Sequence, residues 1–242
     1  MIDSLAVIIL NYRRPQNIGR IVAAAREALP EAPILIYDQG EREDFRGRDD
    51  IPWSEVWVQH AKVNGGSGAR LMLATRLPFE FYVAIDDDTF LTPHQIRRLA
   101  ELVRGESDRA HGVFGQRLEL IEGKIGWRHG IGGIDGAVSI LNLAYAFSRD
   151  QATAAMELAI RLGFATWIEI GSLDDVMLSC ASVKPPLCHD LGGIEQCPTS
   201  SQPGVAQWVE AGFSERRVAA ANQLLVAKKI AVFSPLTLRT GP

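Results

Sequence analysis

The feature that most constrains the fold is a regular alternation of short apolar runs with helical segments over residues 5–90. The first run, residues 5–10, contains only Ala, Val, Ile and Leu. A short run without polar alternation is typical of a strand that is buried on both faces, as in a parallel sheet. Pro15 then begins a segment with apolar residues at helical spacing, and Pro30 ends it. The chain therefore opens with a βα unit.

The same alternation continues as far as residue 104. The further strands expected are 33–37, 55–59 and 79–85, and the further helices expected are 69–76 and 93–104. The polar stretch 41–50 indicates a surface loop. Strands that alternate with helices predict an α/β fold with a mostly parallel sheet, in which ligands bind beyond the carboxyl ends of the strands.

The second half of the chain carries weaker signals. The elements expected there are one hairpin arm at 113–122, helices at 150–162 and 174–181, a strand-like segment at 183–187, a loop at 188–204 and a long terminal helix at 205–227. The sequence shows no repeat, low-complexity tract or clear linker. One compact domain over residues 1–242 is the simplest account.

Composition excludes several classes of protein. Hydrophobic residues make up 47% of the chain and charged residues 22%, as in ordinary globular proteins. The net charge of -4 does not indicate a protein that coats nucleic acid or anionic lipid. Residues 1–11 resemble neither a signal peptide nor a membrane span, so we expect a cytoplasmic protein with no membrane span.

The three cysteines, at positions 180, 188 and 197, are too few and too clustered for a disulfide scaffold in a chain of this length. Reduced thiols are the simplest interpretation. Cys188, His189 and Cys197 leave a zinc site open as an alternative, although the paired C-x-x-C spacing of structural zinc sites is missing.

Three successive carboxylates, Asp86, Asp87 and Asp88, follow the expected strand 79–85. Such neighbours repel one another unless they are solvated, protonated or bridged by a cation. Mg²⁺ and Mn²⁺ prefer carboxylate oxygens together with water and substrate phosphates, and an Asp-x-Asp pair can project two carboxylates to one side of an extended turn. The sequence therefore predicts a divalent metal site here, with a solvated acid cluster as the alternative.

Four segments in order resemble the glycosyltransferases of the GT-A fold, in particular the family 2 and exostosin-like enzymes. The segments are V-I-I-L-N-Y-R at 7–13, the acid Asp38, N-G-G-S-G-A-R at 64–70 and S-L-D-D-V-M-L at 172–178, with the D-x-D of residues 86–88 between the last two. The resemblance covers the whole chain. It implies a Rossmann-like sheet with a nucleotide-sugar-binding half at about 1–104 and an acceptor-binding and catalytic half at about 105–242.

The resemblance also implies roles for individual residues. Asp88 and Asp86 are expected to hold Mn²⁺ or Mg²⁺, and His189 is expected to join them, because many GT-A enzymes use a late histidine as a metal ligand. Asp87 is expected to face the donor ribose or to cap the turn. A lone histidine is more often structural, so a structural role for His189 stays open.

The donor implied is a nucleotide diphosphate sugar, with UDP-linked sugars favoured. The residues expected to contact it are Asn11, Tyr12, Arg13, Asp38, Asn64, Arg70, Asp86 and Asp87. Asp175 is expected to be the catalytic base that takes the proton of the acceptor hydroxyl, with Asp174 as second choice. The alternative for both is an acid pair that only stabilises the amino terminus of a helix.

Trp127, His129 and Asp135 lie in a glycine-rich stretch and are candidate contacts to the donor sugar or the acceptor, while a core position is equally open for the tryptophan. Two departures from the family are clear. Asp38 is not followed by D-G-S-x-D, and the late motif has no Q-x-x-R-W. A processive polymer synthase is therefore not expected.

Three other functions compete with glycosyl transfer. A haloacid dehalogenase-type phosphohydrolase needs threonine where this chain has Phe90. A sugar nucleotidyltransferase needs a glycine-rich basic loop after the first strand, and residues 11–15 contain no glycine. A non-catalytic nucleotide-sugar-binding protein remains the alternative from a different class, since fold alone does not fix function.

Overall fold

A computed structural model describes residues 4–40, 45, 48–126, 131–227 and 229–232. The strands are β1 (Leu5–Asn11), β2 (Ile34–Asp38), β3 (Val56–His60), β4 (Phe81–Asp86), β5 (Thr89–Phe90), β6 (His111–Gln116), β7 (Glu119–Ile121), β8 (Lys124–Gly126), β9 (Ile131–Gly132), β10 (Gly136–Ala137), β11 (Ile140–Ser148), β12 (Leu187–Cys188) and β13 (Glu195–Gln196). The α-helices are α1 (Pro15–Ala28), α3 (Ala69–Arg76), α4 (Pro93–Gly105), α5 (Arg149–Arg161), α6 (Trp167–Ile170), α7 (Asp174–Ala181) and α8 (Phe213–Val226). Three short 3-10 helices are η1 (Trp53–Glu55), η2 (Gly171–Leu173) and η3 (Gln207–Val209).

A central sheet organises the described residues, with the strand order β10-β12-β6-β11-β4-β1-β2-β3 and with β9 paired to β6. The four strands β3, β2, β1 and β4 are parallel, and β11 runs antiparallel to both β4 and β6. The sheet therefore joins strands from both halves of the chain. The parallel strands share one carboxyl edge, where β1 ends at Asn11, β2 at Asp38 and β4 at Asp86.

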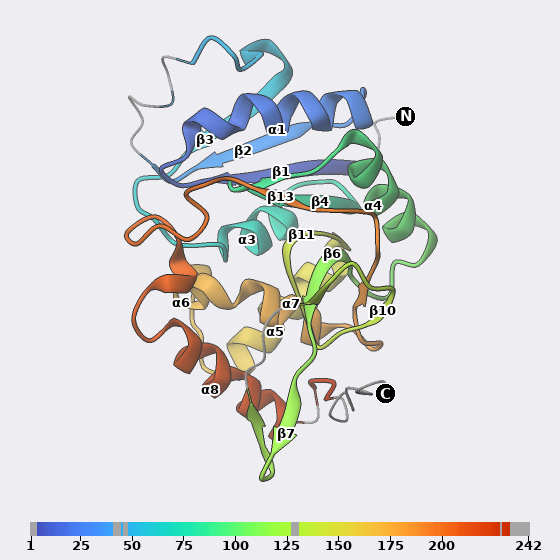
Figure 1. Cartoon of the computed structure of the whole chain (residues 1–242), viewed down its shortest axis with the longest axis vertical. Helices are drawn as coiled ribbons and strands as arrows, with labels where there is room; N and C mark the ends of the chain where they lie inside the picture. Colours follow the sequence, from blue (N-terminus) through green and yellow to red (C-terminus); the bar gives the residue numbers. More distant parts are fainter. Residues whose placement is uncertain (1–3, 41–44, 46–47, 127–130, 228, 233–242) are drawn as a thin grey trace, which may run out of the picture.

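Helices cover both faces of the sheet, which explains why β1 has no polar side chain before its last residue. Val7 and Ile9 pack on one side against α1 and α4, whereas Ile8 packs on the other side against α3, α5 and α7. Figure 1 shows α1 above the parallel strands β1 and β2, and α3, α5, α7 and α8 below them. Side chains alternate between the faces of a strand, so each face needs its own apolar set.

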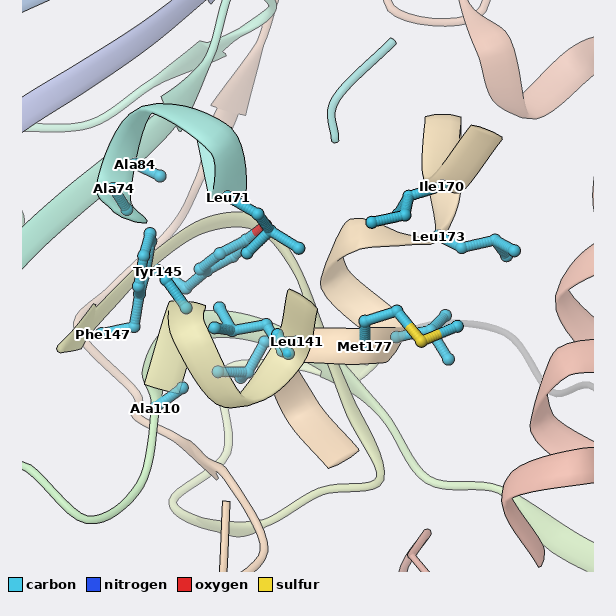
Figure 2. Close-up of a cluster of buried hydrophobic side chains, with 14 of the residues drawn as sticks. Leu71, Ala74, Ala84, Ala110, Leu141, Tyr145, Phe147, Ile170, Leu173 and Met177 are labelled. Carbon is cyan, nitrogen blue, oxygen red and sulfur yellow. The ribbon is translucent and has the colours of Figure 1, made fainter. Parts of the chain in front are cut away.

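The lower core lies between the sheet and helices α3, α5 and α7 (Figure 2). Leu71 of α3, Tyr145 and Phe147 of β11, and Met177 of α7 meet there and are all buried. The ring of Phe147 stacks on Tyr82 of β4 at a centroid distance of 5.7 Å. This packing ties the β4–β11 pair in the middle of the sheet to the helix that begins with Asp174.

Most of the expected elements are confirmed, and the predicted α/β fold with helices on both faces is found. α3 and α7 have the predicted bounds, and β1, β2, β3, β4, α1, α4 and α5 begin and end within about two residues of the prediction. The predicted surface loop 41–50 falls largely outside the described residues.

Three expectations were wrong in part. The predicted helix 205–227 begins only at Phe213, because the backbone is extended at Ala206 and Glu210 and Gly212 has a φ of 78°, which a helix cannot contain. The predicted arm 113–122 is two strands, of which β6 belongs to the central sheet and β7 pairs with β8. Segment 183–187 becomes a strand only at Leu187, and β11 was not predicted.

Across the described residues, no helix combines the length and the apolar character needed to cross a bilayer.

Candidate functional site

A cavity of about 540 Å³ opens at the carboxyl edge of the parallel strands, between β1, β4 and β11 on one side and α7 and α8 on the other. Of the residues predicted from the sequence, those that line it are Tyr12, Asn64, Arg70, Asp86, Asp87, Asp88, Asp174 and Asp175. Asn11, Arg13, Asp38 and His189 do not belong to its lining. The structure thus brings the early acidic turn and the late acidic pair into one site.

The three successive aspartates have different partners. Asp86 forms an ion pair with Arg70, and its side chain keeps about a third of its surface exposed. Asp88 accepts a hydrogen bond from the Thr89 hydroxyl at 3.1 Å, and its other oxygen lies 3.4 Å from a guanidinium nitrogen of Arg14. Both residues line the cavity. Burial, opposed by Arg70 and reinforced by Asp88, raises the pKa of Asp86 to about 6.

Asp87 is directed back toward the start of the chain. One of its carboxylate oxygens accepts the backbone N–H of Tyr12 at 2.6 Å, and the other accepts Arg14 at 2.7 Å. Its own carbonyl accepts the side-chain amide of Asn17 at 2.8 Å. In this structure Asp87 joins the turn after β4 to the turn after β1, which is the turn-capping role that the sequence left open for it.

Arg70 connects the early acidic turn to the late acidic pair. Its guanidinium contacts Asp86 and lies 3.1 Å from Asp174, and it donates to the Tyr145 hydroxyl at 2.9 Å. Its side chain is almost fully buried. Burial acts against its charge, but the nearby carboxylates of Asp86 and Asp174 raise the pKa of Arg70, so it is a fixed cation inside the site.

The late acidic pair begins α7. Asp174 accepts hydrogen bonds from the hydroxyls of Ser67 and Tyr145. Asp175 accepts two hydrogen bonds of 2.7 Å from Arg217 of α8 and a further one from Asn142 of β11. Burial raises the pKa of the Asp175 carboxyl, and the Arg217 guanidinium opposes that rise. Both carboxylates do more than stabilise the amino terminus of α7, because each accepts hydrogen bonds from side chains of other elements.

A β-bulge in β11 explains how one strand reaches both late aspartates. Asn142 pairs with Phe114 of β6 and Tyr145 pairs with Gly112, so three steps along β11 match two along β6. The extra residue puts the side chains of Asn142 and Tyr145 on one face. Leu143 at the bulge has φ of 66°, an unfavourable value for a leucine. Strained backbone of this kind concentrates at functional sites.

The glycine-rich loop 65–68 is shaped by close packing against the second half of the chain. A Cβ on Gly65 would overlap the Trp167 ring, and one on Gly68 would overlap the Trp167 carbonyl. The Gly68 N–H donates to the carbonyl of Gly171 at 2.8 Å. Gln39 holds the same loop, donating to the Gly66 carbonyl and accepting the Gly65 N–H. The loop therefore fixes the positions of Gly66 and Ser67 in the cavity wall.

Asn11 and Asp38 form a buried network with His60. Asn11 donates to Asp38 at 2.6 Å, and the other Asp38 oxygen lies 2.8 Å from Nδ1 of His60. The three residues are paired in register at the ends of β1, β2 and β3. Arg13, with φ of 61°, instead donates to the carbonyl of Gly204 at 3.0 Å.

The structure does not bring His189 to the acidic turn. Its Nε2 lies 3.0 Å from Nδ1 of His111, and the two rings stack. β12, which precedes His189, is separated from β4 by β6 and β11, and neighbouring strands are about 4.8 Å apart. The predicted joint site of His189 with Asp86 and Asp88 is therefore not formed in this structure.

Among the other candidate contacts, Asp135 accepts the backbone N–H of Asp190 at 3.1 Å and has a side chain that is 78% exposed, outside the cavity lining. Trp127 and His129 lie outside the described residues.

The charges around the cavity are unbalanced. Its lining holds five aspartates and three arginines, at positions 14, 70 and 217, which leaves two negative charges when all are ionised. Across the described residues, no group of three or more His, Cys, Asp or Glu side chains is arranged to hold a metal. Asp86 and Asp88 fit a cation that takes two carboxylates and completes its shell with water and phosphate oxygens, as Mg²⁺ does.

Among the lining residues that sequence reasoning did not single out are Arg14, Gln39, Gln116, Asn142, Tyr145 and Arg217. Arg14 gives the clearest signal in retrospect, because it lies between the end of β1 and the first residue of α1. Arg217 gave no signal in the sequence, because α8 and α7 come together only in the folded chain.

The sheet order, the helices on both faces and the acidic turn at the end of β4 define a GT-A type of α/β fold. Two solved structures share it, both of the glycosyltransferase S. aureus TarS. TarS 1-349 superposes with a TM-score of 0.51 at 12% identity, over 81% of this chain and 60% of that chain. TarS 1-349 in complex with UDP superposes with a TM-score of 0.50 at 13% identity, over 78% and 59%.

The chain therefore spans about 60% of the length of the TarS chain that it matches. No protein-family model and no curated protein matches the sequence.

Proposed function

We propose that this protein is a glycosyltransferase that moves a sugar from a nucleotide diphosphate sugar, with UDP-linked sugars favoured, to an acceptor hydroxyl. The observation that carries the proposal is the convergence of two acidic motifs, at 86–88 and 174–175, around Arg70 in one cavity at the carboxyl edge of the sheet. Ligands of open α/β sheets bind at that edge. The UDP complex of TarS, which shares the fold, supports a nucleotide donor.

In the proposed reaction, the bond between the anomeric carbon and the diphosphate breaks and a bond to the acceptor oxygen forms. Asp86 and Asp88 would hold Mn²⁺ or Mg²⁺, which supplies Lewis acidity toward the leaving diphosphate. Arg14 and Arg70 add fixed positive charge beside the same turn.

The acceptor hydroxyl loses its proton as the new bond forms, and Asp175 is the proposed base. It lines the cavity and is more accessible than Asp174, whose side chain is 3% exposed against 12% for Asp175. Arg217 and Asn142 fix the direction of its carboxylate. Asp174, which contacts Arg70 and Tyr145, acts instead as a support for the early acidic turn.

Calorimetry with UDP and Mn²⁺ tests the proposal. We expect Asp88→Ala to abolish the part of UDP affinity that depends on Mn²⁺, whereas Asp175→Asn retains UDP binding and loses transfer. Asp135→Ala is the matched control, because that carboxylate lies outside the cavity. Equal UDP affinity in the wild type and Asp88→Ala with Mn²⁺ present would overturn the metal assignment.

A second experiment separates the enzyme from a non-catalytic nucleotide-sugar-binding protein. A panel of nucleotide sugars is incubated with the wild type, Mn²⁺ and mixed acceptors, and release of nucleoside diphosphate is measured. Donor binding without any release would favour the binding protein.

A further inference from the structure

Two buried amide oxygens in the cavity wall have no hydrogen-bond partner within the described part of the chain, Oε1 of Gln116 and Oδ1 of Asn142. A buried carbonyl oxygen that has lost water and gained no donor costs free energy, and native structures keep few of them. Since both residues line the same cavity, a ligand with hydrogen-bond donors that enters it would satisfy these oxygens. They mark a binding surface that is separate from the acidic turn.

The two amides lie on one face of neighbouring strands. In the β6–β11 ladder Gln116 pairs with Ile140, and Asn142 pairs with Phe114. Residues that pair directly share a face, and so do residues two apart on a strand. Phe114, Gln116 and Asn142 therefore form one contiguous surface, and all three line the cavity.

The orientation of the Asn142 amide is fixed by its neighbour. Its nitrogen donates to Asp175, which as a carboxylate only accepts, so its oxygen is directed away from that contact. A hydroxyl that donates to the Asn142 oxygen consequently lies within one amide group of Asp175. This is where an acceptor hydroxyl has to be if Asp175 takes its proton.

An aromatic ring from the other wall completes the surface. Trp208 lines the cavity and is 57% exposed, although its indole N–H is fixed by a 2.7 Å hydrogen bond to the Ser200 carbonyl. With its polar edge bonded, Trp208 presents only its apolar face. Phe114 adds a second apolar group to the lining. Carbon-bound hydrogens on one face of a sugar ring suit such groups, while the ring hydroxyls suit the amides.

We propose that the surface formed by Phe114, Gln116 and Asn142 binds the acceptor, and that the acceptor presents adjacent hydroxyl groups on a carbon ring or chain, as a saccharide or a polyol does. The inference rests on the proposed function only in calling the bound molecule an acceptor. Binding of a hydroxylated ligand needs neither donor nor turnover.

Ligand-observed NMR on the 242-residue protein without nucleotide tests this inference. The probes are methyl α-glucopyranoside and methyl β-galactopyranoside for a ring, sorbitol for an open chain, and cyclohexanol for an apolar molecule with a single hydroxyl. We expect a pyranoside or sorbitol to bind and cyclohexanol to bind more weakly. Binding of a pyranoside indicates a saccharide acceptor, whereas binding of sorbitol indicates a polyol.

The decisive variant is Gln116→Leu, which keeps the bulk of the side chain and removes its oxygen. We expect it to weaken binding about tenfold, the usual effect of one lost hydrogen bond. Gln116→Glu retains an accepting oxygen and is expected to bind better than Gln116→Leu. Gln202→Leu, an exposed glutamine outside the cavity lining, is the control with unchanged affinity.

Thermal unfolding shows whether Gln116→Leu is folded. If it is not, Gln116→Ser, which shortens the same side chain, is expected to show the same loss of probe affinity. Failure of every hydroxylated probe to bind, equal binding of cyclohexanol, or unchanged affinity in the Gln116 variant that folds would overturn the inference. A bound hydroxylated probe together with absent UDP binding would instead contradict the proposed function and leave this surface as a saccharide or polyol site.

Discussion

If the proposed metal site is right, Asp86 alone would make metal binding depend on pH. Partial removal of its carboxyl from water, together with the neighbouring Asp88, raises its pKa to about 6 even though Arg70 opposes the shift. A cation binds the ionised carboxylate, so below that pKa it has to displace a proton.

We therefore expect the Mn²⁺ affinity of the protein to increase from pH 5 to pH 7 and then to level off. Calorimetry in two buffers with different ionisation enthalpies should also detect proton release on binding at pH 6. In Asp86→Asn the affinity is expected to be weaker and to lose most of this pH dependence. The same Mn²⁺ affinity at pH 5 and pH 7 in the wild type would contradict the expectation.

Single residues also mark how far the sequence could define the site. The run of three aspartates predicted an acidic turn at a strand end, and the turn is there. Their separate partners were not predictable, because Asp86 meets Arg70 and Asp87 meets Arg14 only through folding of distant segments. His189 failed as a predicted neighbour of this turn for the same reason: its distance from Asp88 along the chain carries no information on which strands separate them.

At the scale of elements, α8 controls the proposed base on α7. Arg217 donates twice to Asp175 at 2.7 Å, and it also donates to the Ser172 carbonyl just before α7. Its positive charge counters the effect of burial on the Asp175 carboxyl, which by itself raises the pKa.

Removal of that charge in Arg217→Gln should raise the pKa of Asp175 further. A base has to be ionised, so the acid limb of the pH profile of kcat/KM is expected to move to higher pH, with a larger loss of activity at pH 6 than at pH 8. Arg216→Gln, one residue earlier and exposed, is the control. An equal loss at all pH values would assign Arg217 a structural role only.

Elements differ in how well the sequence predicted them, and the reasons are physical. α3 and α7 were predicted with the right bounds because apolar periodicity and nearby breakers define both ends. β11 was missed because the bulge at Leu143 interrupts the strand periodicity. The side chains of Asn142 and Tyr145, three residues apart, therefore lie on the same face. The start of α8 was placed too early because apolar spacing continues through residues 205–212, although the backbone is extended at Ala206 and Glu210 and left-handed at Gly212.

At the scale of the whole molecule, Arg70 joins the parallel half of the sheet to the helices that follow β11. It contacts Asp86 from β4 and Asp174 from α7, and both guanidinium and Asp174 are buried. Loss of one member of a buried charged cluster leaves the others without compensation, which costs several kcal/mol.

We expect Arg70→Met to lower the free energy of unfolding by about 3 kcal/mol. Denaturation with urea measures this, and Arg76→Met, an exposed residue on the same helix, should change stability by less than about 0.5 kcal/mol. The double variant Arg70→Met with Asp174→Asn should lose less than the sum of the two single losses. Additive losses would show that Arg70 and Asp174 do not act together.

The segment after β12 returns across the molecule to the acidic turn: β13 pairs with β5, the Cys197 N–H donates to the Asp88 carbonyl, and Thr199 accepts from Arg14, 185 residues earlier in the chain. During synthesis, the first strands and helices leave the ribosome long before these partners exist. The acidic turn at residues 86–88 is consequently completed only after the segment 195–199 has been made. A nascent chain that has formed its parallel strands still lacks these contacts, and so cannot yet hold the turn in its final arrangement.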